Sequence, residues 1–289
     1  MQLGDFSVNR VVEAEGPFAA VDFLLPAFDS QIIHQHPWLK PAFVDEQNRV
    51  VMSFHSYVIR TGRHVILVDG CVGNDKERPL RPMWHRQRTD FLARLAAAGV
   101  KREEITLVFC THLHADHVGW NTELRDGRWV PTFPNARYLF SKVEYEYWER
   151  EHRAALARGE PLPNHGSFAD SVLPVMDAKK ADLVASDHEI EHGLHLEAAP
   201  GHTPGTCLLH AENRGAHGIF SGDVLHTPVQ LADPALSSRF CSDPALSAKS
   251  RTALCERIAN TPSFLFTGHF PAPSATRIVR MGNSFSLGS

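Results

Sequence analysis

The sequence predicts one α+β domain, a four-layer αββα sandwich in which two β-sheets pack face to face and helices cover their outer faces. Strand-like runs alternate with helix-like runs in both halves of the chain, as in layered α+β folds. Polar residues that directly follow strand-like runs are spread from position 112 to position 269, and no Pro-, Gly- or Ser-rich linker separates them. We therefore expect a single domain over residues 1–289.

The first predicted elements are a β-hairpin, a helix and a buried strand. Residues 51–60 and 64–69 have the composition of two strands joined by a tight turn. A helix is predicted over 86–98, because its apolar residues share one face and Gly99 provides a stop signal. The apolar run 105–110 then reads as a strand, and a short helix is expected to open near its polar continuation.

The middle of the chain is predicted to contain two strands, a long helix and a loop. Residues 128–133 and 137–140 read as strands. Ser141 is predicted to cap the helix, with Glu144 completing a capping box. The segment 159–172 carries Gly and Pro breakers and little periodicity, so a loop is expected there.

The last third is predicted to be mostly strands around one helix. Three short strands have the spacing of a meander, at 194–199, 206–211 and 217–222. Asp243 followed by Pro244 is typical of a helix start, and this helix should continue to about Asn260. Residues 263–266 read as the last strand before His269.

Composition narrows the class of protein. A formal charge of −4 and a pI near 6.5 provide no basic surface for nucleic acid. The N-terminal residues do not resemble a signal peptide, and no apolar run is long enough for a membrane span. Five cysteines without a CxxC pair suit a reducing compartment. We expect a cytoplasmic protein that binds neither nucleic acid nor membrane.

The run His112-x-His114-x-Asp116-His117 places four strong metal ligands within six residues, directly after an apolar strand. Residues i and i+2 of an extended segment point to the same side, so His112 and His114 can bind one ion while the other two face a second. The same arrangement of an apolar run, a Gly turn and a polar residue recurs at His202, Asp223 and His269. This pattern indicates a metal centre.

The ordered set of seven residues resembles the ligand set of the metallo-β-lactamase superfamily, and the resemblance covers most of the chain. Within that superfamily the sequence is most similar to the N-acyl-homoserine lactonase and organophosphate hydrolase branch. The resemblance implies the αββα metallo-β-lactamase fold. Because relatives are often dimers, it also makes a homodimer a candidate assembly.

The resemblance assigns ligands to two divalent ions. The first ion would be bound by His112, His114 and His202. The second would be bound by Asp116, His117 and His269, and Asp223 would bridge both. Five imidazoles and two carboxylates suit zinc, and they also accept manganese, iron or cobalt.

The resemblance implies hydrolysis of lactones or small carboxylic esters. A hydroxide held between two ions would attack the carbonyl, and Asp116 is predicted to pass a proton to the leaving alkoxide. Phosphotriesters are a second expected substrate class, because their transition state also develops charge on oxygen. A small-molecule ester or lactone is thus the expected partner.

Two further residues are candidates. Three positions after the bridging aspartate, acyl-homoserine lactonases carry a tyrosine, whereas this chain has His226. His226 is predicted either to hydrogen-bond the substrate or to support the metal site from behind. Asp69 resembles the family's carboxylate that orients the ligand loop, and the alternative for this Asp-Gly pair is a simple turn.

Three alternatives remain open from the sequence. A β-lactam hydrolase is disfavoured because its thiolate-containing relatives carry Cys where Asp223 stands. A glyoxalase-type thioesterase shares the bridging aspartate, but no basic C-terminal tract is evident. A metal-binding protein that has lost catalysis would be expected to lack at least one ligand, and here every position is filled.

Overall fold

The computed structural model describes residues 1–288, which form two compact units. The first unit comprises Met1–Ala14 and Phe54–Ser186, and the second comprises Glu15–Ser53 and the chain from Asp187 onward. The two boundaries near the N-terminus fall inside continuous strands, β2 (Phe6–Ala20) and β3 (Arg49–Arg60). Each unit has its own sheet and hydrophobic core.

The sheet of the first unit is mixed, with strand order β1-β2-β3-β4-β5-β8-β9. The strands not yet introduced are β1 (Gln2–Leu3), β4 (Val65–Val68), β5 (Leu107–Cys110), β8 (Arg137–Ser141) and β9 (Ala181–Val184). β3 and β4 form the predicted antiparallel hairpin, whereas β4, β5, β8 and β9 are parallel neighbours. Parallel strands require long crossovers, and these contain the helices of the unit.

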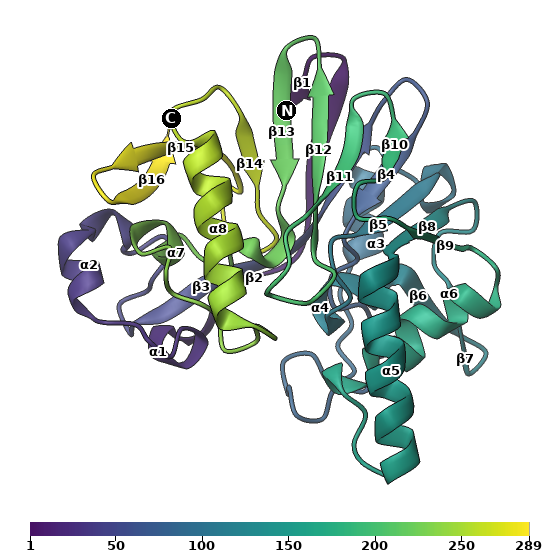
Figure 1. The fold of residues 1–289 in the computed structure, drawn as a ribbon. Helices are drawn as coiled ribbons and strands as arrows, with labels where there is room; N and C mark the ends of the chain where they lie inside the picture. Colours follow the sequence, from purple (N-terminus) through teal and green to yellow (C-terminus); the bar gives the residue numbers. More distant parts are fainter. Residues whose placement is uncertain (289) are drawn as a thin grey trace. The chain divides into compact units, whose positions relative to one another are not determined.

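Helices pack on the sheet of the first unit around one buried cluster. The helical segments are α3 (Phe91–Ala97), η2 (Arg102–Glu104), α4 (Ala115–Val118), η3 (Gly119–Asn121), α5 (Lys142–Arg158), η4 (Asn164–Gly166), η5 (Phe168–Val172) and α6 (Leu173–Asp177). Phe91 of α3, Trp148 of α5 and Val172 belong to the same cluster as Tyr138 of β8. Figure 1 shows α5 beside β8 and β9. β6 (Thr122–Arg125) and β7 (Arg128–Pro131) form a separate two-stranded sheet.

The second unit contains a sheet with strand order β10-β11-β12-β13-β14-β15-β16. Its strands are β10 (Glu189–Glu191), β11 (Leu194–Ala198), β12 (Cys207–Asn213), β13 (Ala216–Phe220), β14 (Phe264–Phe266), β15 (Ala275–Met281) and β16 (Ser284–Gly288). All neighbours are antiparallel except β13 and β14. The meander β11-β12-β13 agrees with the prediction.

Short helices and one long helix complete the second unit. They are α1 (Val21–Leu24), α2 (Gln31–Gln35), η1 (Pro37–Leu39), η6 (Gly222–Val224), α7 (Val229–Ala232) and α8 (Pro244–Ile258). α8 packs Leu254 and Ile258 against Ile219 of the sheet, and Asp243 caps it by accepting the Leu246 N–H, as predicted. In the described part of the chain, every helix is too short or too polar to cross a bilayer.

The predicted helix over 86–98 is wrong at its start, because α3 begins only at Phe91. Arg86 has a left-handed backbone, with φ 51°, which a helix does not tolerate. Its N–H donates to the Lys76 carbonyl, and Asn74 bonds to the backbone of Thr89. These long-range bonds hold 86–90 against the segment 74–76 in place of a first helical turn.

The predicted capping box is also wrong, and the loop predicted over 159–172 is wrong in its last residues. Ser141 makes no side-chain cap bond, and Glu144 accepts hydrogen bonds from the Leu113 N–H and from Trp148 Nε1. The predicted loop over 159–172 ends in the π-helix η5, which continues into α6. The predicted strands at 128–133 and 137–140 are present as β7 and β8, and β7 pairs with the unpredicted strand β6.

Candidate metal centre

The ligand-rich loop of the first unit begins where the fully buried strand β5 ends. His112 is fully buried, and its Nε2 lies 3.1 Å from His114 Nδ1. The ring of His117 lies 4.1 Å from that of His112, measured between centroids. Asp116 and His117 lie on α4, and their candidate ligand atoms are within 4.8 Å of each other. The structure therefore brings the four predicted residues of this unit together.

Asp69 fixes the orientation of this loop from the end of β4. Its carboxylate accepts the Thr111 N–H at 2.7 Å and the Thr111 hydroxyl at 2.9 Å. The same carboxylate lies 2.9 Å from His117 Nδ1. Because a carboxylate accepts, Nδ1 carries the proton, and the lone pair of His117 is on Nε2. These contacts agree with the loop-orienting role expected for Asp69.

Two residues that the sequence analysis did not single out for this purpose hold the backbone of the loop. Glu144 accepts the Leu113 N–H at 3.0 Å. Asn164 accepts the Ala115 N–H at 3.0 Å and donates to the Leu113 carbonyl at 2.7 Å. Both residues are far from the loop in sequence, so no local pattern identifies them.

In the second unit, one buried carboxylate is surrounded by three imidazoles. Asp223, which follows β13, has Oδ2 at 3.3 Å from His202 Nε2 and 3.2 Å from His226 Nε2. Its Oδ1 lies 3.1 Å from His269 Nε2. All four side chains are almost completely buried. The structure therefore brings His202, Asp223 and His269 together, with His226 beside them.

The other ring nitrogens of His202 and His269 face groups of the same unit. His269 Nδ1 lies 3.0 Å from the Ser53 carbonyl oxygen, and Ser53 N–H donates to the His269 carbonyl. His202 Nδ1 lies 3.6 Å from Cys241 Sγ, a thiol whose pKa is raised by burial. No spacing in the sequence places Cys241 beside His202, so the sequence does not predict this contact.

These contacts fit a cation. A carbonyl oxygen only accepts, so His269 Nδ1 carries the proton, and neutral His269 directs its Nε2 lone pair at Asp223 Oδ1 from 3.1 Å. Two electron pairs at that distance repel unless a proton or a cation lies between them. Imidazoles held at one nitrogen by the protein, with the other facing a carboxylate, are typical of metal sites.

His226 is buried, and its Nε2 makes the contact to Asp223 without the geometry of a hydrogen bond. Within residues 1–288, no hydrogen-bond partner reaches its Nδ1 either. Its backbone N–H donates to Gln230 Oε1 at 2.7 Å, which fixes the start of the side chain. The His226 ring thus lies beside the Asp223 carboxylate, and neither ring nitrogen makes a hydrogen bond within the second unit.

Comparison with protein families identifies the superfamily. The model of the metallo-beta-lactamase superfamily matches residues 53–269, which is more than half of the chain. A similar curated protein is an N-acyl homoserine lactonase of Bacillus cereus, 28% identical over 177 residues. An N-acyl homoserine lactonase of Bacillus thuringiensis is 26% identical over 176 residues. Each alignment covers 61% of this chain, and the chain spans 60% of the length of each relative.

Comparison with solved structures shows the fold. The hydrolase AbOPH of the beta lactamase superfamily has a TM-score of 0.81 at 22% identity, covering 99% of this chain and 95% of that one. AidC, described as a dizinc quorum-quenching lactonase, has a TM-score of 0.79 at 22% identity, covering 100% and 95%. These likenesses confirm the predicted α+β fold of the superfamily.

Proposed function

The chain belongs to the metallo-beta-lactamase superfamily, and from this premise we propose that it is a dinuclear metal-dependent hydrolase of lactones or small carboxylic esters. The observation that carries the proposal is the contact of Asp223 with His269, which requires a proton or a cation between a carboxylate oxygen and an imidazole lone pair. The ligand loop of the first unit also needs a proton or a cation between two ring nitrogens, because His112 Nε2 and His114 Nδ1 lie 3.1 Å apart.

We propose the ligand set that the superfamily implies, because the match over residues 53–269 includes every one of these residues. The proposed ligands are His112, His114, Asp116, His117, His202, Asp223 and His269. This donor set of imidazoles and carboxylates suits zinc, and manganese, iron or cobalt are accepted by the same atoms.

When bound, the two ions supply a hydroxide nucleophile and polarise the carbonyl or phosphoryl oxygen. The residues of the chain do the rest. Asp69 holds Thr111 and His117 in orientation. Asp116 is the proposed proton carrier, because its half-buried carboxylate can take a proton from the attacking water and give it to the leaving alkoxide.

The substrate class follows from the relatives and from His226. The curated relatives are named N-acyl homoserine lactonases, so a lactone ring is the leading substrate. We assign to His226 a hydrogen bond to the substrate carbonyl or carboxylate, because its ring nitrogens have no hydrogen-bond partner among residues 1–288. Phosphotriesters are a second class that the same chemistry accepts.

The test is a panel of aliphatic and aromatic lactones, aryl esters and phosphotriesters, assayed after reconstitution with zinc, manganese and cobalt. Asp116→Asn is compared with Asp126→Asn, which changes an exposed carboxylate in a turn. We expect at least two ions per chain in the wild-type protein. We expect Asp116→Asn to lower kcat by about 10²-fold or more and the control to match the wild type.

Two results would overturn the proposal. One is a wild-type protein that holds less than one ion per chain after reconstitution. The other is an Asp116→Asn variant that hydrolyses every substrate at the wild-type rate. Activity toward thioesters alone, with none toward lactones or esters, would transfer the assignment to a thioesterase.

A further inference from the structure

Three histidines on neighbouring strands of the second unit form a stack that the proposed hydrolase centre does not use. His195 on β11 is the register partner of His210 on β12, and His217 on β13 is the register partner of Glu212 on β12. The rings of His195 and His210 are 4.7 Å apart and inclined by 3°, and those of His210 and His217 are 5.2 Å apart and inclined by 14°. Side chains two residues apart on a strand share a face, so Glu212 lies on the same face as His210.

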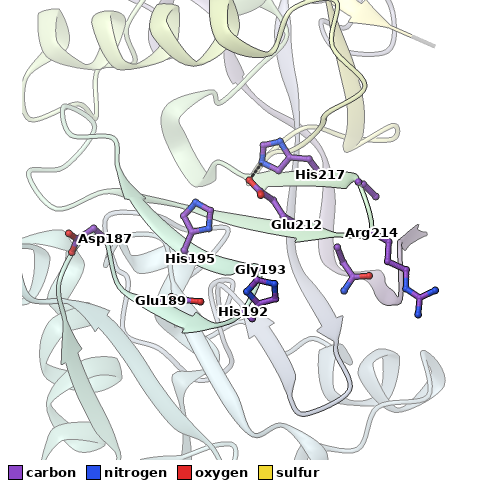
Figure 2. A pocket seen from close by; sticks show the side chains of 11 residues that line it. Asp187, Glu189, His192, Gly193, His195, Glu212, Arg214 and His217 are labelled. Carbon is purple, nitrogen blue, oxygen red and sulfur yellow. Dashed lines mark ion pairs between the residues drawn. The ribbon is translucent and has the colours of Figure 1, made fainter.

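His195, Glu212 and His217 border an open cleft of about 750 Å³ in the second unit. Figure 2 shows His195, Glu212 and His217 at this cleft, with the ion-pair contact of 3.5 Å between His217 Nε2 and Glu212 Oε1 drawn as a dashed line. One ligand atom from each of His195, His210 and Glu212 lies within 4.8 Å of the others. The cleft gives an ion a path from solvent to these atoms.

A chain of hydrogen bonds fixes the protonation of His210. Arg257 donates to both carboxylate oxygens of Glu197, at 2.8 and 2.9 Å. This bidentate ion pair with Arg257 favours the ionised form of the Glu197 carboxylate. Glu197 Oε2 lies 2.8 Å from His210 Nε2, so this nitrogen carries the proton and Nδ1 has the lone pair.

The lone pair on His210 Nδ1 faces His217 Nε2 at 3.0 Å. Neutral imidazole is the form that binds metal. Glu197 thus holds Nε2 of His210 while Nδ1 faces the open side of the cluster. Histidine ligands in metal sites are commonly held by a carboxylate in this way.

We propose that this cluster binds a divalent transition-metal ion, such as zinc, through His195, His210 Nδ1, Glu212 and His217 Nε2. Tetrahedral zinc with bonds of about 2.0–2.2 Å separates its ligand atoms by roughly 3.3–3.6 Å. The distances from His217 Nε2 to His210 Nδ1 and to Glu212 Oε1 are 3.0 and 3.5 Å, close to this range.

His217 can change its protonation to suit the ion. Its Nδ1 lies 3.0 Å from the hydroxyl of Ser263. In the metal-free cluster Nε2–H donates to His210, and Ser263 donates to Nδ1. With the ion bound, the proton is on Nδ1 and is donated to Ser263, because a hydroxyl both donates and accepts. The ion would link β11, β12 and β13.

The experiment compares zinc binding by the full chain with that of His195→Ala/Glu212→Gln, in which both changed side chains are at least partly exposed. The matched control is His192→Ala, because His192 lines the same cleft and is outside the ligand set. Bound zinc is counted by mass spectrometry after equilibration, and affinity is measured by calorimetry. We expect the double variant to bind one zinc fewer than the wild type and the control to bind the same number. We expect Glu197→Gln to weaken this site by roughly 10- to 100-fold.

Equal zinc counts and equal affinities in the wild type and the double variant would overturn the proposal and leave only a hydrogen-bond chain. The experiment measures a difference of one bound ion between two proteins, so its result does not depend on whether the hydrolase centre binds metal. Hydrolytic activity should be unchanged in these variants. If the double variant fails to fold, His195→Gln alone gives the same comparison, with the loss of a single imidazole.

Discussion

Asp69 joins the backbone of the ligand loop to one of its imidazoles. In Asp69→Asn, an amide oxygen can still accept from Thr111, but the amide NH2 then faces the N–H of His117. We expect metal affinity to fall roughly 10- to 100-fold, as for other groups that orient ligating histidines. Competition with a chelating dye measures it. Asp75→Asn is the control, because Asp75 has the same φ of 61° and contacts Arg88. Equal affinities in both variants would mean that Asp69 only forms a turn.

Replacing His226 should slow the proposed reaction without removing metal. We expect His226→Ala to lower kcat/KM for lactones by about 10²-fold, as for removal of a hydrogen bond to a developing oxyanion, while the metal content stays that of the wild type. Steady-state kinetics and metal analysis check both parts. His34→Ala removes an exposed imidazole and should be neutral. Wild-type rates and affinities with every substrate would remove His226 from the reaction.

The sequence identifies the candidate ligands better than their supports. His112 to His117 form a compact motif, whereas Glu144 and Asn164 reach the loop from α5 and η4. Glu144 does fit a local capping pattern, but the buried Leu113 N–H and Trp148 Nε1 compete for its carboxylate. An unpaired N–H in the interior costs more free energy than an uncapped helix start, so the long-range contact prevails.

At the scale of the element, the junction of α4 and η3 depends on Gly119. A Cβ at this position would lie 1.8 Å from the Val72 carbonyl oxygen, so the two segments must separate. We expect Gly119→Ala to lower the free energy of unfolding by about 3 kcal/mol, as for overpacked sites. Urea unfolding followed by circular dichroism measures it. A variant as stable as wild type would contradict the close approach.

Gly62→Ala is the matched control for Gly119→Ala. Gly62 lies in the turn between β3 and β4, and a Cβ there would meet nothing within 4 Å. The control should therefore unfold within about 0.5 kcal/mol of the wild type, as exposed substitutions generally do. The contrast separates the close packing beneath the ligand loop from any general cost of replacing glycine.

Elements with strong periodicity were predictable, and those set by distant contacts were not. β3, β4, β5 and the meander follow from apolar runs and turns. The start of α3 was misplaced because residues 86–90 bond to the segment 74–76. The stack of His195, His210 and His217 has no spacing that marks a motif, since only the register of three antiparallel strands aligns the rings.

At the scale of the whole molecule, stability should depend on pH through Lys76. This lysine is buried, with Nζ 2.7 Å from the Thr122 hydroxyl and 3.7 Å from Asp170. Burial lowers its pKa to about 7, and Asp170 opposes the shift. Between pH 7 and the ordinary lysine pKa the unfolded chain binds more protons than the folded one, so this group makes stability rise with pH.

We expect Lys76→Met to flatten the rise of Tm between pH 7 and 8.5, measured by calorimetry at constant ionic strength. The window stops there because burial raises the pKa of Cys71, and ionisation of that thiol in the unfolded chain opposes the lysine effect at higher pH. Lys142→Met is the control, since Lys142 is exposed and pairs with Glu146. Identical Tm profiles for all three proteins would contradict the assignment to Lys76.

Strand β2, which carries Glu13, supports segments next to the ligand loop although it lies far from the motif in sequence. Glu13 accepts the N–H groups of Val72 and Gly73 and that of Trp120 Nε1, all within the first unit. A translation start downstream of this strand, or a protease that removes it, would leave these three donors without their acceptor. Shortened forms are thus expected to retain every histidine of the motif in sequence and yet lose the rigid backbone that the proposed catalysis requires.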